Sequence, residues 1–189
     1  SGPAEIIDKA SDGAIGSVMR RGDIAGKLGT TLVLHNVAGT FADRILLVGL
    51  GKERNLDERT YRKAHVAAAR ALRQTGAIDA VSYLSHLPLK GRDFHWNLQQ
   101  AVIATEDHFY RFDDCRGENA KAHLPSYKLE RYTFDVPRRS DLPAGEKGLA
   151  EGLAISKGMT LTRNLGNLPG NICTPAYLAE QAPKPAQQY

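Results

Sequence analysis

Acidic residues, a histidine and a cysteine lie close together near the middle of the sequence and contain the side chains that bind metal ions. They are Glu106, Asp107, His108, Asp113, Asp114 and Cys115. Zinc sites space their ligands so that the side chains converge, as in a Cys-x-x-Cys pair. Consecutive side chains point in different directions, and this segment has no helical or zinc spacing. We therefore interpret it as a solvated turn and assign it no metal ligand.

Two glycines follow an apolar segment in VGLGK, residues 48–52, and could form a phosphate-binding turn. The dinucleotide-binding motif needs a third glycine and a helix that opens directly after it. Here the third glycine is missing and the predicted helix starts several residues later. We interpret the segment as a turn that ends a strand, with Gly51 at positive φ.

Aromatic and amide side chains offer two further candidates. His95 lies between Phe94 and Trp96 and could stack on a nucleic-acid base, but a helix that packs its aromatic residues into the core explains the same residues better. Three asparagines near the C-terminus could act as ligands, although capping and turn roles suit their glycine and proline neighbours better. These are Asn164, Asn167 and Asn171. We assign no catalytic, cofactor-binding or metal-binding residue.

The first elements follow from the spacing of apolar residues. Residues 4–21 predict a helix with a break near Gly13, because apolar residues recur every three or four positions. Residues 30–34 and 44–50 predict strands. The unbroken apolar run RILLVGL of the second predicts a strand covered on both faces, as in an α/β sheet.

A helix after this strand is the clearest element of the sequence. Asn55 followed by Glu58 matches a capping box, and Gly76 ends the helix. One face is apolar and comprises Tyr61, Ala64, Ala68, Ala71 and Leu72. The opposite face is basic and comprises Arg59, Arg62, Lys63, Arg70 and Arg73. Residues 80–84 predict another strand, so the strands on either side of the helix are expected to be parallel neighbours.

The second half of the chain changes in composition. The predicted elements are a helix over 94–112, a loop over 113–126, a strand over 128–136 near the edge of the sheet, a linker over 137–148, a helix to about 163 and a short helix from Thr174 that Pro183 and Pro185 end. We expect a domain boundary near 137–145, which divides the chain into 1–140 and 141–189.

Bulk properties fit an ordinary globular protein. Hydrophobic residues make up 42% of the 189 residues and charged residues 24%. The sequence shows no secretory signal and no apolar run near the roughly 20 residues that span a bilayer. The two cysteines are far apart, which favours a reducing, cytoplasmic environment. The net charge of +4 is scattered along the chain, which favours solubility over a dedicated nucleic-acid surface.

Three segments resemble the leucyl aminopeptidase family of two-metal peptidases. They are SDGAIGSVMRRGDIAGKLGTTLVLHN (11–36), RILLVGLGKERNLDERTYRKAHVAAARAL (44–72) and TRNLGNLPGNICTPAYLAEQA (162–182). The resemblance implies a mixed α/β N-terminal domain of the macro-domain type, with a largely parallel sheet flanked by helices. It also implies a C-terminal linker helix, which leads to a larger catalytic domain, and a homo-hexamer.

The resemblance further implies catalysis by two divalent cations, manganese or zinc, that activate a bridging water. The family's signature for that site resembles NTDAEGRL, which does not occur here. We therefore expect the N-terminal, non-catalytic part of an enzyme that removes N-terminal amino acids from peptides. Its expected role is to pack against its catalytic domain and neighbouring subunits and to restrict access to the active site. The alternatives are a DNA-binding module of a bifunctional aminopeptidase and a binder of a nucleotide metabolite such as ADP-ribose.

Overall fold

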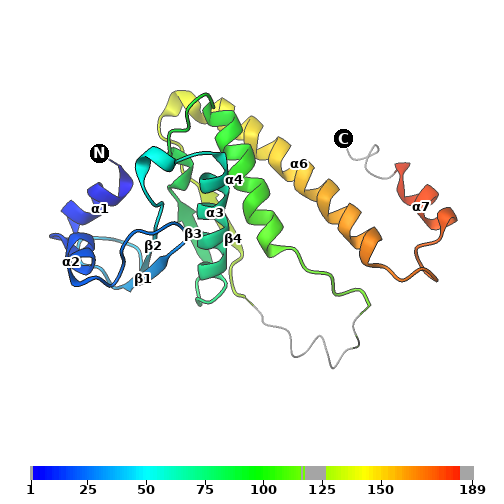
Figure 1. The fold of residues 1–189 in the computed structure, drawn as a ribbon, viewed down its shortest axis with the longest axis horizontal. Helices are drawn as coiled ribbons and strands as arrows, with labels where there is room; N and C mark the ends of the chain where they lie inside the picture. Colours follow the sequence, from blue (N-terminus) through cyan, green and yellow to red (C-terminus); the bar gives the residue numbers. More distant parts are fainter. Residues whose placement is uncertain (1, 116, 118–126, 184–189) are drawn as a thin grey trace.

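The computed structural model describes residues 2–115, 117 and 127–183 (Figure 1). The described chain begins with two short helices and an antiparallel pair of strands. These elements are α1 (Pro3–Ala10), α2 (Ala14–Arg21), β1 (Thr31–His35) and β2 (Arg44–Val48). The helices are separated at the predicted position, because Gly13 adopts a φ of 82° that other residues rarely take.

The described strands form two separate two-stranded sheets. β1 pairs with β2 in antiparallel register, from Thr31 opposite Val48 to His35 opposite Arg44. Strand β3 (Asp79–Ser82) pairs in parallel with β4 (Arg131–Phe134). The mixed α/β class is therefore confirmed. The expected pairing of the strands on either side of the basic helix is wrong, because β2 takes its partner from the adjacent hairpin and β3 takes its partner from much later in the chain.

Helix α3 (Glu58–Leu72) forms where the sequence predicts it and packs against β1, β2 and the next helix, but its cap differs from the prediction. The side chain of Asp57 accepts a hydrogen bond from the backbone N–H of Thr60 at 2.7 Å, whereas Asn55 belongs to the short 3₁₀ helix η1 (Glu53–Asn55). Asp57 occupies the position before the first helical residue, where a carboxylate reaches the free N–H groups. The predicted alanine face is buried against its neighbours.

Helix α4 (Phe94–Phe109) packs on the outer side of α3 and completes the main core. The buried cluster contains Tyr61, Leu89, Leu98 and Ala101, and Phe94, Trp96 and Phe134 pack against it. The 3₁₀ helix η2 (Leu84–His86) joins β3 to the segment before α4. The predicted packing of aromatic residues against the core is confirmed for Phe94 and Trp96, which are partly buried, whereas Phe109 stacks on Tyr127.

Helix α6 (Leu142–Asn167) follows the 3₁₀ helix η3 (Arg139–Asp141) and lies along α4 (Figure 1). It begins inside the segment predicted as a linker, because the glycines of that segment serve helix packing and do not form a loop. A short helix α7 (Pro175–Gln181) follows where a helix is predicted, and the side chain of Thr174 caps it. In the described part of the chain, no helix is both long and apolar enough to cross a lipid bilayer.

Candidate functional site

The contact between α4 and α6 depends on a stripe of small residues on α6. Gly145, Gly148, Gly152 and Ser156 are its buried residues, spaced by three and four positions on one face. A Cβ atom on Gly148 would lie 2.5 Å from the backbone oxygen of His95, far inside van der Waals contact. The two helix backbones can therefore approach this closely only because these side chains are absent.

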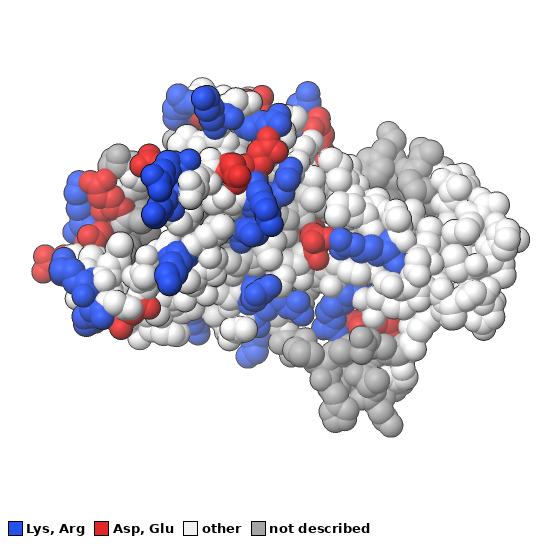
Figure 2. Space-filling model, in the orientation of Figure 1, with Lys and Arg blue, Asp and Glu red and all other residues white. Residues whose placement is uncertain are grey.

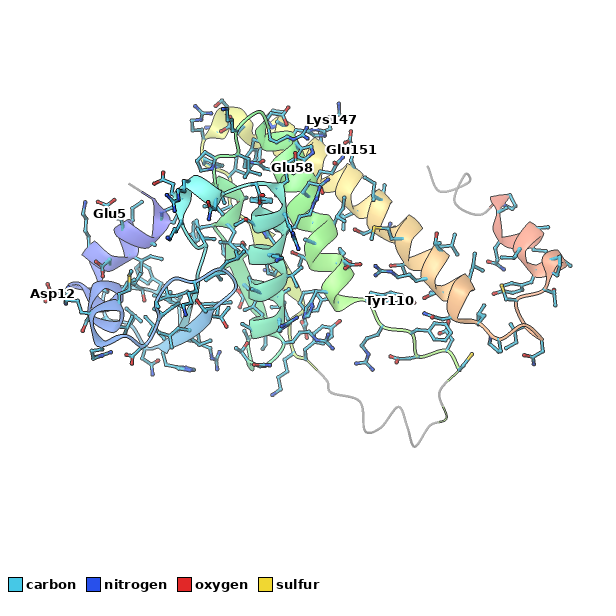
Figure 3. The ribbon with its side chains drawn as sticks, in the orientation of Figure 1. Glu5, Asp12, Glu58, Tyr110, Lys147 and Glu151 are labelled. Atoms are coloured by element: carbon cyan, nitrogen blue, oxygen red, sulfur yellow. The ribbon has the colours of Figure 1, made fainter. Side chains whose placement is uncertain are left out.

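Polar contacts flank the glycine stripe. The Nε2 atom of His95 lies 2.8 Å from Oε2 of Glu151, and Nε2 of Gln99 donates to the same oxygen at 2.9 Å. Figure 3 shows Glu151 and Lys147 on the side of α6 near α4. These contacts give His95 a partner on α6, so its ring does not form a stacking platform.

The other faces of α6 carry exposed apolar side chains. They are Leu142, Leu149, Leu153 and Ile155, each 37–44% exposed. We call these four residues the α6 outer face. A solvated helix on the surface of a globular protein normally carries charged residues on its outward side. Leu142, Leu149 and Leu153 recur at seven- and four-residue steps on one side of the helix, and Ile155 lies on another side. Exposed apolar residues gathered along a helix in this way mark an interaction site.

The exposed apolar surface continues into the C-terminal arm, which we define as residues 168–183. Glu180 is the one charged residue of this arm. Ile172 and Leu178 are exposed, and α7 contains no buried residue. In Figure 2 the charged side chains gather over the body of the molecule, whereas the end that carries α7 is almost free of them. The α6 outer face and the C-terminal arm together form the strongest candidate site of the described chain.

The glycine turn after β2 cannot accept a phosphate in the usual way. Gly51 has a φ of 75°, as predicted, and its N–H donates to the backbone oxygen of Gly26 at 2.9 Å. The N–H of Gly49 donates to Thr30 at 2.7 Å. Because both amides are engaged in the fold, the turn has a structural role.

The acidic residues at and after the end of α4 form separate structural contacts. Asp107 forms an ion pair with Arg163 of α6, and Asp113 pairs with Arg111 at 2.8 Å. Burial lowers the pKa of His108, and Arg73 and Arg70 nearby lower it further. Among residues 2–115, 117 and 127–183 no three His, Cys, Asp or Glu side chains are grouped as metal ligands.

The asparagines near the end of α6 have a different role from the predicted one. The side chains of Asn164 and Asn167 both bond to the hydroxyl of Tyr110, at 2.9 and 3.0 Å. Asn171 lies in the turn that leads to α7, as expected. Sequence analysis missed the contact with Tyr110 because it joins residues that are more than fifty positions apart.

A buried histidine in α3 was also missed. His65 is fully buried, and neither ring nitrogen has a hydrogen-bond partner. Burial lowers its pKa to about 3, so the ring is neutral. Tyr61, one turn earlier, lies edge-on to the ring, and its hydroxyl donates to the backbone oxygen of Asn97. The pair belongs to the packed core and has no access to substrate.

Comparison with known protein families identifies the family of this chain. Residues 1–119 match the model of the cytosol aminopeptidase family, N-terminal domain. The chain belongs to the cytosol aminopeptidase family. This result confirms the resemblance seen in the sequence. It also gives a context for the α6 outer face and the C-terminal arm, because both lie beyond the matched domain.

Curated relatives in this family are much longer than the chain. A probable cytosol aminopeptidase of Chromobacterium violaceum is 51% identical over 186 residues, which is 98% of this chain and 35% of that protein. One from Colwellia psychrerythraea is 47% identical over 182 residues, 96% of this chain and 36% of that protein. The chain therefore spans about a third of the length of these relatives. Neither is named for nucleic-acid binding, and the DNA-binding alternative gains no support.

Solved structures share the fold at low sequence identity. A tomato leucine aminopeptidase mutant superposes with a TM-score of 0.74 and 24% identity, over 100% of this chain and 36% of that one. The bottromycin maturation enzyme BotP in complex with Mn gives 0.71 and 23%, over 93% of this chain and 34% of that one. The similarity continues through α6 and α7, beyond residue 119.

Proposed function

We propose that this chain is the N-terminal, non-catalytic part of a metal-dependent leucyl aminopeptidase that removes N-terminal amino acids from peptides. The main support is its match to the family's N-terminal domain together with relatives about three times its length. The division into 1–140 and 141–189 is part of this proposal. In this division α6 links the two parts, and the residues of α6 from Gly145 to Ser156 pack on α4.

The described residues do not fit the pair of manganese or zinc ions that such an enzyme would use. A two-metal site needs several carboxylates that converge on the ions, and no such group occurs in the described chain. We therefore place the metals and the catalytic groups in the portion of the relatives that this chain does not cover. No catalytic step is assigned to the residues of this chain.

The exposed apolar surface supports a structural role. We propose that the α6 outer face and the C-terminal arm pack against the catalytic portion. Burial of apolar surface would stabilise that contact by about 25 cal/mol for each Å² removed from water. In the complete cytoplasmic protein, the domain would also contact neighbouring subunits of a homo-hexamer and restrict the entry of peptides to the active site.

A chimera tests this function. The chain should replace the matching first third of the Chromobacterium violaceum relative, since 51% identity over 98% of the chain preserves most contacts. The chimera, supplied with Mn²⁺, should hydrolyse a leucyl anilide, whereas the isolated chain should show no turnover with Mn²⁺ or Zn²⁺.

Two results would contradict the proposal. One is hydrolysis by the isolated chain that scales with its concentration and persists after further purification. The other is a folded chimera, shown by its circular dichroism, that does not hydrolyse the anilide while the unmodified relative does.

A second chimera that carries Leu149→Glu and Leu153→Glu serves as the interface control. It should lose activity because its two portions no longer assemble.

A further inference from the structure

Helix α6 is held to α4 by different means along its length. All of its buried residues, Gly145 to Ser156, lie between its start at Leu142 and Ser156. No described residue of α6 after Ser156 is buried. In Figure 1 the two helices diverge toward their C-terminal ends. The last turns of α6 therefore cannot depend on the close packing that fixes the first turns.

Tyr110 bridges the two helices where they diverge. It is the first residue after α4, and its hydroxyl donates to Oδ1 of Asn164 at 2.9 Å. The hydroxyl oxygen of Tyr110 also accepts a hydrogen bond from Nδ2 of Asn167 at 3.0 Å. Figure 3 shows Tyr110 beside the last turns of α6. One hydroxyl thus engages the side chains of two asparagines in the final helical turn.

Arg163 strengthens this bridge from the preceding turn. Its guanidinium lies 5.2 Å from the centre of the Tyr110 ring and forms an ion pair with Asp107 in the last turn of α4. A cation over an aromatic ring is attracted by the electrons of the ring face. We call Asp107, Tyr110, Arg163, Asn164 and Asn167 the Tyr110 cluster.

We propose that the Tyr110 cluster is a conformational latch that fixes the angle between α4 and the last turns of α6. It thereby sets the direction in which the chain leaves the domain. The chain leaves the helix at Leu168, where the backbone turns extended, with φ −69° and ψ 139°. Because the latch consists of polar contacts at partly exposed positions, it can open while the glycine stripe stays packed.

Hydrogen exchange on Tyr110→Phe tests the latch. The change removes the hydroxyl and keeps the ring, so amides of residues 160–167 should exchange about 5 to 30 times faster, as expected for the loss of two hydrogen bonds. Amides of residues 148–156 should keep their exchange rates. Tyr177→Phe is the matched control, since no hydrogen bond of its hydroxyl occurs among the described residues, and it should change neither segment.

The native cysteines allow a direct measurement of geometry. Cys115 and Cys173 are the only cysteines of the chain. Cys115 follows α4 and Cys173 follows α6, the two helices that the latch joins. The distance between spin labels on them, measured in excess unlabelled protein, should be more broadly distributed in Tyr110→Phe than in the unchanged chain.

Unchanged exchange at 160–167 together with an unchanged distance distribution would overturn the latch. Equal acceleration across 148–156 and 160–167 would also overturn it, because the effect would then be global. If Tyr110→Phe does not fold, Asn167→Ala replaces it, because Asn167 is exposed. This variant should accelerate exchange in the last turn alone, and no acceleration would reject the latch.

Discussion

Two glycines of α6 should respond in opposite ways to alanine. A Cβ on Gly148 meets backbone atoms of α4 at 2.5 and 3.2 Å, so Gly148→Ala should force the helices apart and destabilise the chain by about 1–3 kcal/mol. Gly158 has no neighbouring atom within 4 Å, and Gly158→Ala should stabilise by about 0.5–1 kcal/mol through helix propensity. Urea unfolding measures both. Equal effects would show that α6 does not approach α4 this closely.

The buried histidine makes the stability of the chain depend on pH. The folded state holds the pKa of His65 at about 3, below the ordinary 6.5. Below pH 6.5 the unfolded chain therefore binds a proton that the folded chain does not bind. This contribution to stability is complete above pH 6.5 and falls by about 1.4 kcal/mol for each pH unit between 6.5 and 3.

His65→Leu should remove that dependence. At pH 7.5 the variant should be at least as stable as the unchanged chain, because two unpaired ring nitrogens leave the core. Its advantage should grow by about 1.4 kcal/mol for each pH unit as the pH falls from 6 to 4. Urea unfolding at several pH values tests this, and other titrating groups cancel in the difference. Parallel stability curves would contradict the burial of an uncharged ring.

Residue roles followed from sequence where they are local. The positive φ of Gly51 and the start of a helix near Thr174, with Pro175 in its first turn, depend on neighbours in sequence and were predicted. Gly148 was assigned to a linker because its helical role depends on α4, far away in sequence. The burial of His65 was equally invisible, since a histidine on the inner face of a helix carries no signal of its partners.

At the scale of elements, the cap of α3 gives a paired test. Asp57→Ala removes the acceptor for the N–H of Thr60 and should lower the midpoint of thermal unfolding by roughly 2–4 °C. Asn55→Ala should change it by less than about 1 °C, because its side chain caps nothing in the described structure. The hydrogen bond from the Thr60 N–H lowers the pKa of Asp57. The difference in unfolding midpoint between Asp57→Ala and the unchanged chain should therefore shrink below pH 3.8. A larger effect at Asn55 would restore the predicted capping box.

The elements themselves were largely predictable, because helices report their buried faces through spacing. The alanine face of α3 is buried as predicted, and Phe94 and Trp96 of α4 pack against the core. Strand pairing was not predictable from the same pattern. The apolar run of β2 fits a parallel or an antiparallel neighbour, and the nearby β1 supplied the partner.

At the scale of the whole molecule, the C-terminal arm should be dispensable for folding. α7 contains no buried residue, so a chain that ends at Leu168 should keep its unfolding midpoint in urea within error. The same truncation should reduce self-association in sedimentation velocity, since it removes exposed Ile172 and Leu178. A marked loss of stability would show that the arm packs on the body.

The parallel pairing of β3 and β4 has a consequence for the order of folding. Asp79 lies opposite Arg131, and the two are 52 positions apart (131 − 79 = 52). Such a long loop closes at an entropic cost that a local hairpin such as β1–β2 avoids. During synthesis, β3 must therefore wait for its partner to leave the ribosome, by which time the whole of α3 and α4 has emerged. We expect the two helices to associate first and to present a surface on which the late strand docks.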